Sequence, residues 1–114
     1  MTRIYKILSR ADWDAAVALG AYAGSADDVR DGYIHLSPAD QVEGTARKYF
    51  AGRDDLVLVV FEAEALGPAL KWEPSRGGAL FPHLYAPLPT AAALEVRAMP
   101  LGADGAPDAG RLDP

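Results

Sequence analysis

The sequence contains no cysteine among its 114 residues, which excludes disulfides, thiolate metal sites and cysteine nucleophiles. Its only histidines are His35 and His83. Neither has another histidine three to five positions away, so a histidine-rich zinc site is excluded and we predict no bound metal. The G-x-S-x-G, Walker and G-x-G-x-x-G motifs are missing as well. No motif therefore names a reaction.

Long apolar runs and basic clusters are also scarce. The longest apolar run is Leu56 to Phe61, far short of the roughly 20 residues of a membrane helix. The N-terminal segment soon becomes charged and does not resemble a signal peptide, so we expect a cytoplasmic protein. The net charge is −5 and the 11 basic residues are scattered. This pattern disfavours membranes and duplex nucleic acid as partners, whereas a nucleotide could bind at a local site.

The first half of the sequence predicts two strand–helix units. Residues 3–8 are typical of a strand, and Ser9 and Gly20 mark the start and stop of a helix. Residues 21–32 are predicted to form a loop. The expected buried face of this helix follows from three- and four-residue spacing: Trp13, Ala16 and Val17.

The second unit consists of a short strand at residues 33–36 and a helix that follows it directly. Ser37 is the predicted N-cap and Pro38 the first helical residue, and Gly52 is the predicted stop. The expected buried face of this helix is Val42, Ala46, Tyr49 and Phe50.

The second half of the sequence is richer in strands. Residues 56–62 form a continuous apolar run that predicts a central strand, and residues 69–74 and 93–101 predict two more. The glycines and prolines of residues 75–89 favour a shaped loop. Together these elements predict an α+β fold, with two main helices packed on a small mixed or antiparallel sheet. We expect one domain over residues 1–101 and a flexible tail over residues 102–114.

The segment "DGYIHLS" is the first candidate for a binding site. Strand alternation places Tyr33, His35 and Ser37 on one face, and the core residues Ile34 and Leu36 on the other. His35 also precedes the predicted helix N-terminus, which favours a neutral imidazole and a phosphate-bearing ligand. The alternative is a partly buried histidine that binds a backbone carbonyl.

The segment "LFPHLYAPLP" is the second candidate. His83 lies beside Pro82 and between Phe81 and Tyr85, on a loop that three prolines restrict. We expect His83 and His35 to converge on one cleft, with their imidazoles within about 10 Å, a span that one small ligand can bridge. The alternative is a loop that inserts its apolar residues into the core and leaves His83 outside.

Three further residues are candidate ligand contacts. Trp72 would form an aromatic wall of the cleft, Glu73 would supply a carboxylate, and Arg76 would close over an anion. For Glu73 and Arg76 the alternative is an ordinary place on the surface.

With both histidine segments in view, the sequence resembles the bacterial family known as domain of unknown function 952. The resemblance runs from about Arg3 to Leu101. It rests on "IYKI", "DGYIHLS", "QVEGTARKYF", "LVLVV", "LKWEP" and "LFPHLYAPL". One departure is Ala86, where the family pattern has glycine, the residue that most readily adopts positive φ.

The resemblance implies a fold similar to the ADP-ribosyltransferase catalytic core, with a bent sheet that cradles an NAD-like dinucleotide. By analogy Tyr33, His35, Trp72, His83 and Tyr85 would line the cleft. Active transferases place a glutamate late in the fold, where this sequence offers His83 and then only Glu95. Nucleotide binding therefore follows from the resemblance more readily than ADP-ribosyl transfer does.

Three functions compete at this point. The first is a small-molecule or nucleotide-binding domain that uses a histidine-lined cleft, either as a binding protein or as an ADP-ribosyltransferase-related enzyme. In this function His35 and His83 are the candidate catalytic residues. The second is a non-catalytic interaction module that docks a partner protein through residues 81–85. The third is a hydrolytic site that uses Glu73 and a histidine.

Overall fold

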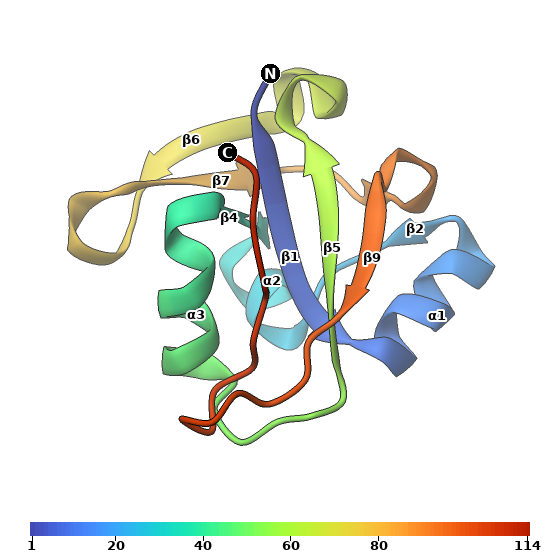
Figure 1. Ribbon diagram of the computed structural model, residues 1–114. Coiled ribbons are helices and arrows are strands. Elements are labelled where there is room, and N and C mark those ends of the chain that lie inside the picture. The colour runs from blue at the N-terminus through green and yellow to red at the C-terminus, as the bar shows by residue number, and fades with distance from the viewer.

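Four antiparallel strands form the central sheet of the computed structural model, in the order β4-β1-β5-β9 (Figure 1). The structure describes residues 1–114, except for the side chain of Arg76. β1 pairs with β5 along its whole length. The prediction of a central strand at residues 56–62 is therefore confirmed. The bounds of the four strands are β1 (Arg3–Ser9), β4 (Ser37–Pro38), β5 (Leu56–Glu62) and β9 (Glu95–Ala98).

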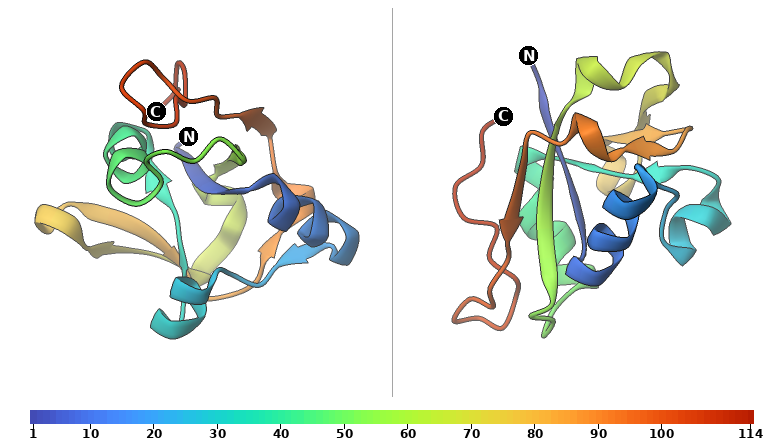
Figure 2. Two further views of the ribbon diagram at one scale, coloured as in Figure 1. Left: turned by 90° about the horizontal axis from the view of Figure 1, so that it is seen from below. Right: turned by 90° about the vertical axis from the view of Figure 1, so that its right-hand side faces the viewer.

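Both faces of the central sheet are buried, because successive apolar side chains of β1 and β5 point to opposite faces. One face packs against α1 (Arg10–Leu19), and the opposite face packs against α3 (Val42–Tyr49) and the C-terminal segment (Figure 2). The first core contains Ile4, Leu8, Trp13, Ala16, Val57, Val59 and Phe61. The second contains Tyr5, Ile7, Val42, Ala46, Leu56, Leu58 and Val60.

The first helix has the predicted ends. The Ser9 hydroxyl accepts a hydrogen bond from the backbone N–H of Asp12 at 3.0 Å, and Gly20 ends the helix with φ of 87°. Trp13 is buried and meets Phe61 edge-on, with ring centroids 6.4 Å apart. The prediction for Val17 was wrong, since its side chain is 53% exposed. The buried stripe of this short helix is narrower than its apolar pattern suggested.

The second helix begins later than predicted. Ser37 and Pro38 are held in strand β4, where Ser37 pairs with Tyr5 of β1, so Ser37 is not an N-cap. A 3₁₀ turn follows, and α3 itself begins at Val42 and ends at Tyr49. Val42 and Ala46 are buried as predicted, whereas Tyr49 is exposed. Pairing with β1 therefore prevailed over the local capping signal.

The predicted loop at residues 21–32 contains two regular elements, β2 (Ala21–Tyr22) and α2 (Ala26–Asp31). α2 begins with a capping box: the Ser25 hydroxyl accepts from the backbone N–H of Asp28, and the Asp28 carboxylate accepts from the backbone N–H of Ser25. The serine and aspartate three positions apart are the sequence signal for this helix. The prediction gave more weight to the surrounding glycines.

The predicted loop at residues 75–89 was also wrong, because it contains β7 (Leu80–Leu84) and β8 (Leu88–Pro89). β7 is the middle strand of a second sheet, between β3 (Ile34–His35) and β6 (Leu70–Pro74), while β8 pairs with β2. Pro82 is tolerated in this middle strand because its carbonyl, which accepts from the N–H of Leu36 at 3.1 Å, faces β3. Its missing N–H therefore leaves the ladder with β6 intact.

Short 3₁₀ segments connect the strands. Ala86, which stands where the family pattern has glycine, causes no backbone strain. Ala86 has negative φ, since all residues with positive φ are glycines. A residue with a Cβ therefore fits this position without backbone strain. The 3₁₀ segments are Ala39–Gln41, Ala63–Ala69, Arg76–Gly78 and Thr90–Ala92.

Residues 102–114 run along the central sheet on the side of α3 (Figure 1). Ala109 is buried, and Arg97 of β9 donates hydrogen bonds to the carbonyls of Ala109 at 2.8 Å and Arg111 at 2.7 Å. The Tyr5 hydroxyl donates to the carbonyl of Asp113. These contacts are more extensive than the composition of the segment suggested. Its flexibility stays a prediction.

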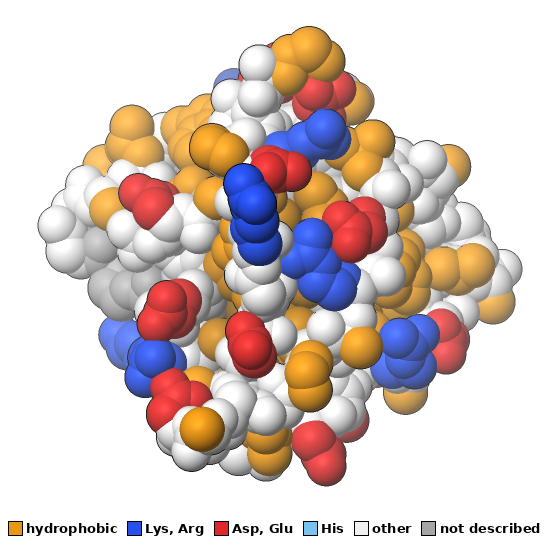
Figure 3. Space-filling model, viewed as in Figure 1, with side chains coloured by type: hydrophobic (Ala, Val, Ile, Leu, Met, Phe, Trp, Pro, Cys, Tyr) orange, Lys and Arg blue, Asp and Glu red, His pale blue; other side chains and the backbone are white. Residues whose placement is uncertain are grey.

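The surface and the helix lengths bear on the expected partners. Among the helices of the described residues, none is long and apolar enough to cross a membrane. On the face shown in Figure 3, Lys and Arg side chains are interspersed with Asp and Glu. That face therefore offers no continuous basic surface to a phosphate backbone.

Candidate functional site

The two histidines lie side by side on neighbouring strands. β3 and β7 pair so that His35 is opposite His83, and their imidazole centroids are 5.7 Å apart. This confirms the expected convergence. The core side of β3 is also as predicted, because Ile34 and Leu36 are buried.

Tyr33 joins the two imidazoles into one cluster of rings. Its ring stacks on His83 with a centroid distance of 4.0 Å and an interplanar angle of 26°. The same ring lies 4.6 Å from His35 and 5.2 Å from Tyr85. The cluster therefore consists of two imidazoles and two phenols that restrict one another's rotation.

His35 is held by two carboxylates of α2. Its Nδ1 lies 2.6 Å from Oδ1 of Asp28, and its Nε2 lies 3.0 Å from Oδ2 of Asp31. Its backbone N–H also donates to Oδ1 of Asp28 at 3.0 Å. A neutral imidazole has one N–H, so a neutral His35 donates to only one of these two carboxylates.

Asp28 is in turn paired with the buried Lys6. The Lys6 ammonium lies 3.0 Å from Oδ2 of Asp28 and donates to the carbonyl of His35 at 2.8 Å. Burial lowers the pKa of Lys6, and Asp28 partly offsets this effect. Burial alone would raise the pKa of Asp28, but Lys6, Ser25 and His35 outweigh it, so that the pKa is lowered. The pair therefore supports the site as a fixed ion pair.

The sequence predictions missed the role of this ion pair. Asp28 was placed in a loop, although its spacing from Ser25 is a capping-box signal. Lys6 follows Ile4 and precedes Leu8 on the core-facing side of β1. A lysine at an inward position of a strand requires a buried partner, and this was the available signal.

His83 has a carboxylate partner of its own. Its Nδ1 lies 2.8 Å from Oε1 of Glu73, and the Tyr85 hydroxyl donates to the same oxygen at 2.7 Å. The hydrogen bonds from Tyr85 and His83 lower the pKa of Glu73. The Glu73 carboxylate correspondingly raises the pKa of Tyr85 to about 12.

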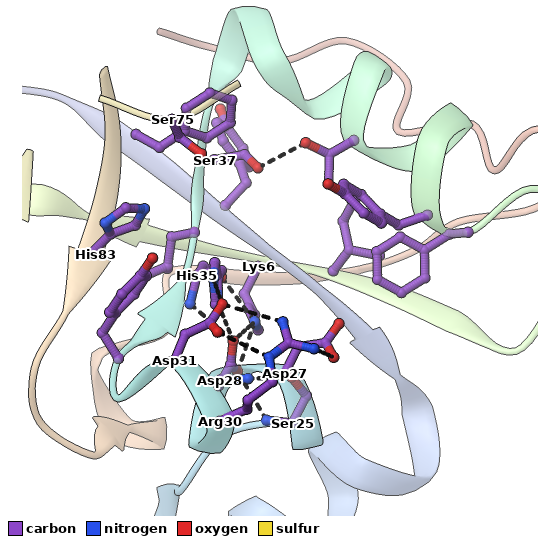
Figure 4. A pocket seen from close by; sticks show the side chains of 18 residues that line it. Lys6, Ser25, Asp27, Asp28, Arg30, Asp31, His35, Ser37, Ser75 and His83 are labelled. Atoms are coloured by element: carbon purple, nitrogen blue, oxygen red, sulfur yellow. Dashed lines mark hydrogen bonds and ion pairs between the residues drawn. The ribbon is translucent and has the colours of Figure 1, made fainter. Parts of the chain in front are cut away.

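His83 also lines a cavity. His83 is only 4% exposed, yet Nε2 has no hydrogen-bond partner among the described residues. No buried polar side-chain atom in the described part of the chain lacks a partner, so Nε2 is not fully enclosed by protein atoms, and His83 is one of the residues that line the cavity. Figure 4 shows the His83 ring at the wall of this cavity, close to His35.

The cavity has a volume of about 320 Å³ and is lined by residues of the second sheet, α2, β1 and α3. His35, His83 and Asp31 lie at its polar end. Tyr49 and Phe50 line it from the end of α3, and Phe81 from β7. The cavity therefore has one charged end and aromatic side chains elsewhere, as small-ligand pockets commonly do.

The structure brings most of the predicted site residues together. Tyr33, His35, Ser37 and His83 line the cavity. Glu73 is connected to the cavity by its contact with His83, and Tyr85 by its hydrogen bond to Glu73. The predicted anion contact of Arg76 lies outside the described residues.

Trp72 is not part of this site, contrary to the prediction. In β6 it pairs with Pro82, whereas His83 pairs with Lys71. Because successive side chains of a strand point to opposite faces, Trp72 lies on the face away from His83. Its side chain is 40% exposed. The prediction failed because the register between β6 and β7 was not known.

Two further expectations were wrong. A helix N-terminus was expected beside His35, where it would favour a phosphate, but α3 begins only at Val42, and His35 contacts carboxylates of α2 instead. The interaction module required residues 81–85 to be exposed. Residues 81–84 are buried in β7 and only Tyr85 is exposed, so this segment presents no flat docking patch.

The acidic side chains of this site already have partners. Among the described residues, no group of three or more His, Asp and Glu side chains is arranged to hold a metal ion. The carboxylates near the histidines already accept hydrogen bonds from Lys6, Arg30 and the imidazoles.

Comparison with known proteins places the chain in a family. The X-ray structure of protein CC0527 from Caulobacter crescentus is 56% identical, covers 94% of each chain and has a TM-score of 0.92. A double mutant of that protein matches with 55% identity, 94% of each chain and a TM-score of 0.91. Its solution NMR structure matches with 57% identity, 94% of this chain, 92% of the other and a TM-score of 0.85.

No curated protein matches the chain. The family model described as "Protein of unknown function (DUF952)" matches residues 7–96. The resemblance first seen in the two histidine segments thus extends over most of the chain, which belongs to the DUF952 family.

Proposed function

We propose that the cavity binds a small organic molecule and that His83 exchanges a proton with it through Nε2. The observation that carries this proposal is the pairing of His83 Nδ1 with Glu73 at 2.8 Å in a residue that lines the cavity, with Nε2 left without a partner among the described residues. A carboxylate that accepts from Nδ1–H fixes the tautomer with a lone pair on Nε2. This is the arrangement of a histidine that acts as a general base and then as a general acid.

The surroundings of His83 support this role. The ring is buried, stacked on Tyr33 and bonded to Glu73, so its orientation is set before a ligand arrives. Glu73 is itself held by Tyr85. A reactive group that neighbouring contacts fix in this way loses little freedom on binding.

Nucleotide binding is the finer form of this proposal, and the aromatic and polar groups around the cavity support it for the base and sugar of such a ligand. ADP-ribosyl transfer rests on the family resemblance alone. The late glutamate Glu95 bonds to Arg97 on β9 and does not line the cavity, and Glu73 is engaged by His83 and Tyr85. The histidines and Glu73 therefore support acid–base chemistry more directly than transfer from a dinucleotide.

The test is a binding screen by NMR. The isotope-labelled chain is mixed with a library of small metabolites that includes nucleosides and nucleotides. We expect some compounds to shift the signals of Tyr33, His35 and His83, and the variant His83→Gln to lose those shifts while it keeps its fold. Trp72→Ala, on the opposite face of the sheet, is the control and should bind normally. If all shifts map outside the cavity, or survive in His83→Gln, the proposal fails.

A further inference from the structure

We infer that the ligand of this cavity is a neutral molecule that joins a flat ring to several hydroxyl groups, the chemistry that nucleosides and aryl glycosides share. This inference rests on the function proposed above and adds the class of ligand. It follows from the size of the cavity, the charges that line it and the hydrogen-bonding groups left for a ligand.

The size of the cavity favours a compact ligand. Its volume of about 320 Å³ lies at the lower end of the roughly 300–1,000 Å³ that small-molecule pockets occupy. A nucleoside or a phenyl glycoside has one ring system and one sugar, which suits such a space. A dinucleotide carries two nucleosides and two phosphates and would extend well beyond it.

The charges of the lining disfavour a phosphate. The described cationic side chains of the lining are Lys6 and Arg30. Lys6 is paired with Asp28, and Arg30 bonds to Asp27 and Asp31, so both cations are already neutralised. With a neutral His35, three carboxylates therefore face two cations in this part of the wall, and they repel an added anion. A neutral ligand avoids that repulsion.

The free hydrogen-bonding capacity of the wall favours hydroxyl groups on the ligand. Asp31 accepts from Arg30 at 3.0 Å and lies 3.0 Å from His35, yet its side chain is 31% exposed. A carboxylate offers about four lone-pair sites, so Asp31 can accept from ligand hydroxyls as well. Nε2 of His83 is a further acceptor, and the hydroxyls of Ser37 and Ser75 both donate and accept.

The aromatic part of the wall accounts for the ring. Tyr49 and Phe50 at the end of α3 and Phe81 of β7 line the cavity. Tyr49 remains 60% exposed, although it was expected to pack in the core. An exposed tyrosine at the wall of a cavity is a suitable partner for stacking with a flat ligand ring.

Calorimetric titration with adenosine, AMP and phenyl β-glucoside tests the inference, and the first and third probes separate the two sources of this chemistry. We expect adenosine or phenyl β-glucoside to bind, and AMP to bind about tenfold more weakly than adenosine. Tyr49→Ala and Asp31→Asn should each weaken binding by about tenfold. Both side chains are partly or largely exposed, so these variants should fold, and Leu19→Ala and Asp14→Asn on α1 are the matched controls.

The outcomes separate this inference from the proposed function. Tighter binding of AMP than of adenosine, or full binding by Tyr49→Ala and Asp31→Asn, would overturn the ligand class. If none of the three probes binds while other compounds of the NMR screen bind through His83, the ligand class is wrong and the proposed function stands. If adenosine binds equally well to His83→Gln, the proton exchange at His83 is wrong while the ligand class stands.

Discussion

The two carboxylate–imidazole pairs of this protein are built in opposite ways. In the Asp28–His35 pair the carboxylate is buried, with 2% of its side chain exposed, and the imidazole is 36% exposed. In the Glu73–His83 pair the imidazole is buried, with 5% exposed, and the carboxylate is 39% exposed. The partner that is buried differs, although both contacts use Nδ1 of the histidine.

This difference in burial suggests different roles for the two pairs, one in the stability of the fold and one in the chemistry of the site. Asp28 accepts hydrogen bonds from α2, from β1 through Lys6 and from β3, so it joins three elements of the fold. Glu73 accepts hydrogen bonds from His83 and Tyr85 near the surface, whereas the imidazole that it orients lines the cavity. We conclude that the first pair mainly stabilises the structure and the second mainly serves the site.

The largest expected effect of this difference is on stability. Asp28→Ala leaves the Lys6 ammonium buried without its counter-ion and removes the capping box of α2. Removal of one partner of a buried ion pair costs about 3–5 kcal/mol. Urea unfolding measures this loss. Asp27→Ala, at the exposed neighbouring position, is the control and should change the free energy of unfolding little.

The second expected effect is on acid stability. Because the folded-state pKa of Asp28 is lowered, its stabilising contribution is complete above the unfolded-state pKa of about 3.9 and is lost as pH falls through the folded value. The free energy of unfolding should therefore fall below about pH 4. Asp28→Asn should make this decline clearly shallower, and an unchanged pH profile would argue against the ion pair as a source of stability.

A smaller effect on stability and a specific effect on binding are expected for Glu73→Gln. Its side chain is partly exposed, so the urea midpoint should stay close to that of the unchanged protein. Loss of the carboxylate removes the charge that fixes the tautomer of His83, and compounds identified in the screen should bind about tenfold more weakly. The imidazole ¹⁵N signals of His83 report the tautomer directly. A loss of stability as large as that of Asp28→Ala would contradict the division between the two pairs.

The smallest effect is expected for Tyr85→Phe. Tyr85 is 47% exposed, and its hydroxyl donates to the Glu73 carboxylate. Loss of this hydrogen bond, the main cause of the lowered pKa of Glu73, should move that pKa back toward its ordinary value. A ¹³C titration of the Glu73 carboxyl measures the shift. Ligand binding should weaken by less than about threefold, and a complete loss of binding would show that Tyr85 contacts the ligand.

Local signals predicted the parts of the fold that local interactions determine. The alternation in residues 3–8, the long apolar run of β5 and the Ser9 cap of α1 each correspond to the observed element. Alternation in residues 33–37 likewise predicted that His35 lies on the face of β3 away from the core. That prediction led to the expected convergence of His35 and His83.

The wrong predictions concern residues whose structure depends on long-range strand pairing. Ser37 has the local pattern of a helix cap, but backbone pairing with Tyr5 holds it in a strand. Pro82 argues against a middle strand unless the direction of its missing N–H is known, and that direction depends on β3. The place of Trp72 likewise depends on the register between β6 and β7. No local pattern specifies these contacts.

The position of Lys6 also has a consequence during synthesis. β1 finds its long partner only when β5 is available, since Arg3 pairs with Glu62 and Ser9 with Leu56. At roughly 5–20 residues per second, a nascent chain needs several seconds to reach that point. Through this interval the segment "RIYKIL" is an unpaired apolar strand, and charges within such segments oppose aggregation. We therefore expect Lys6 to oppose aggregation of the nascent strand before it pairs with Asp28 in the folded protein.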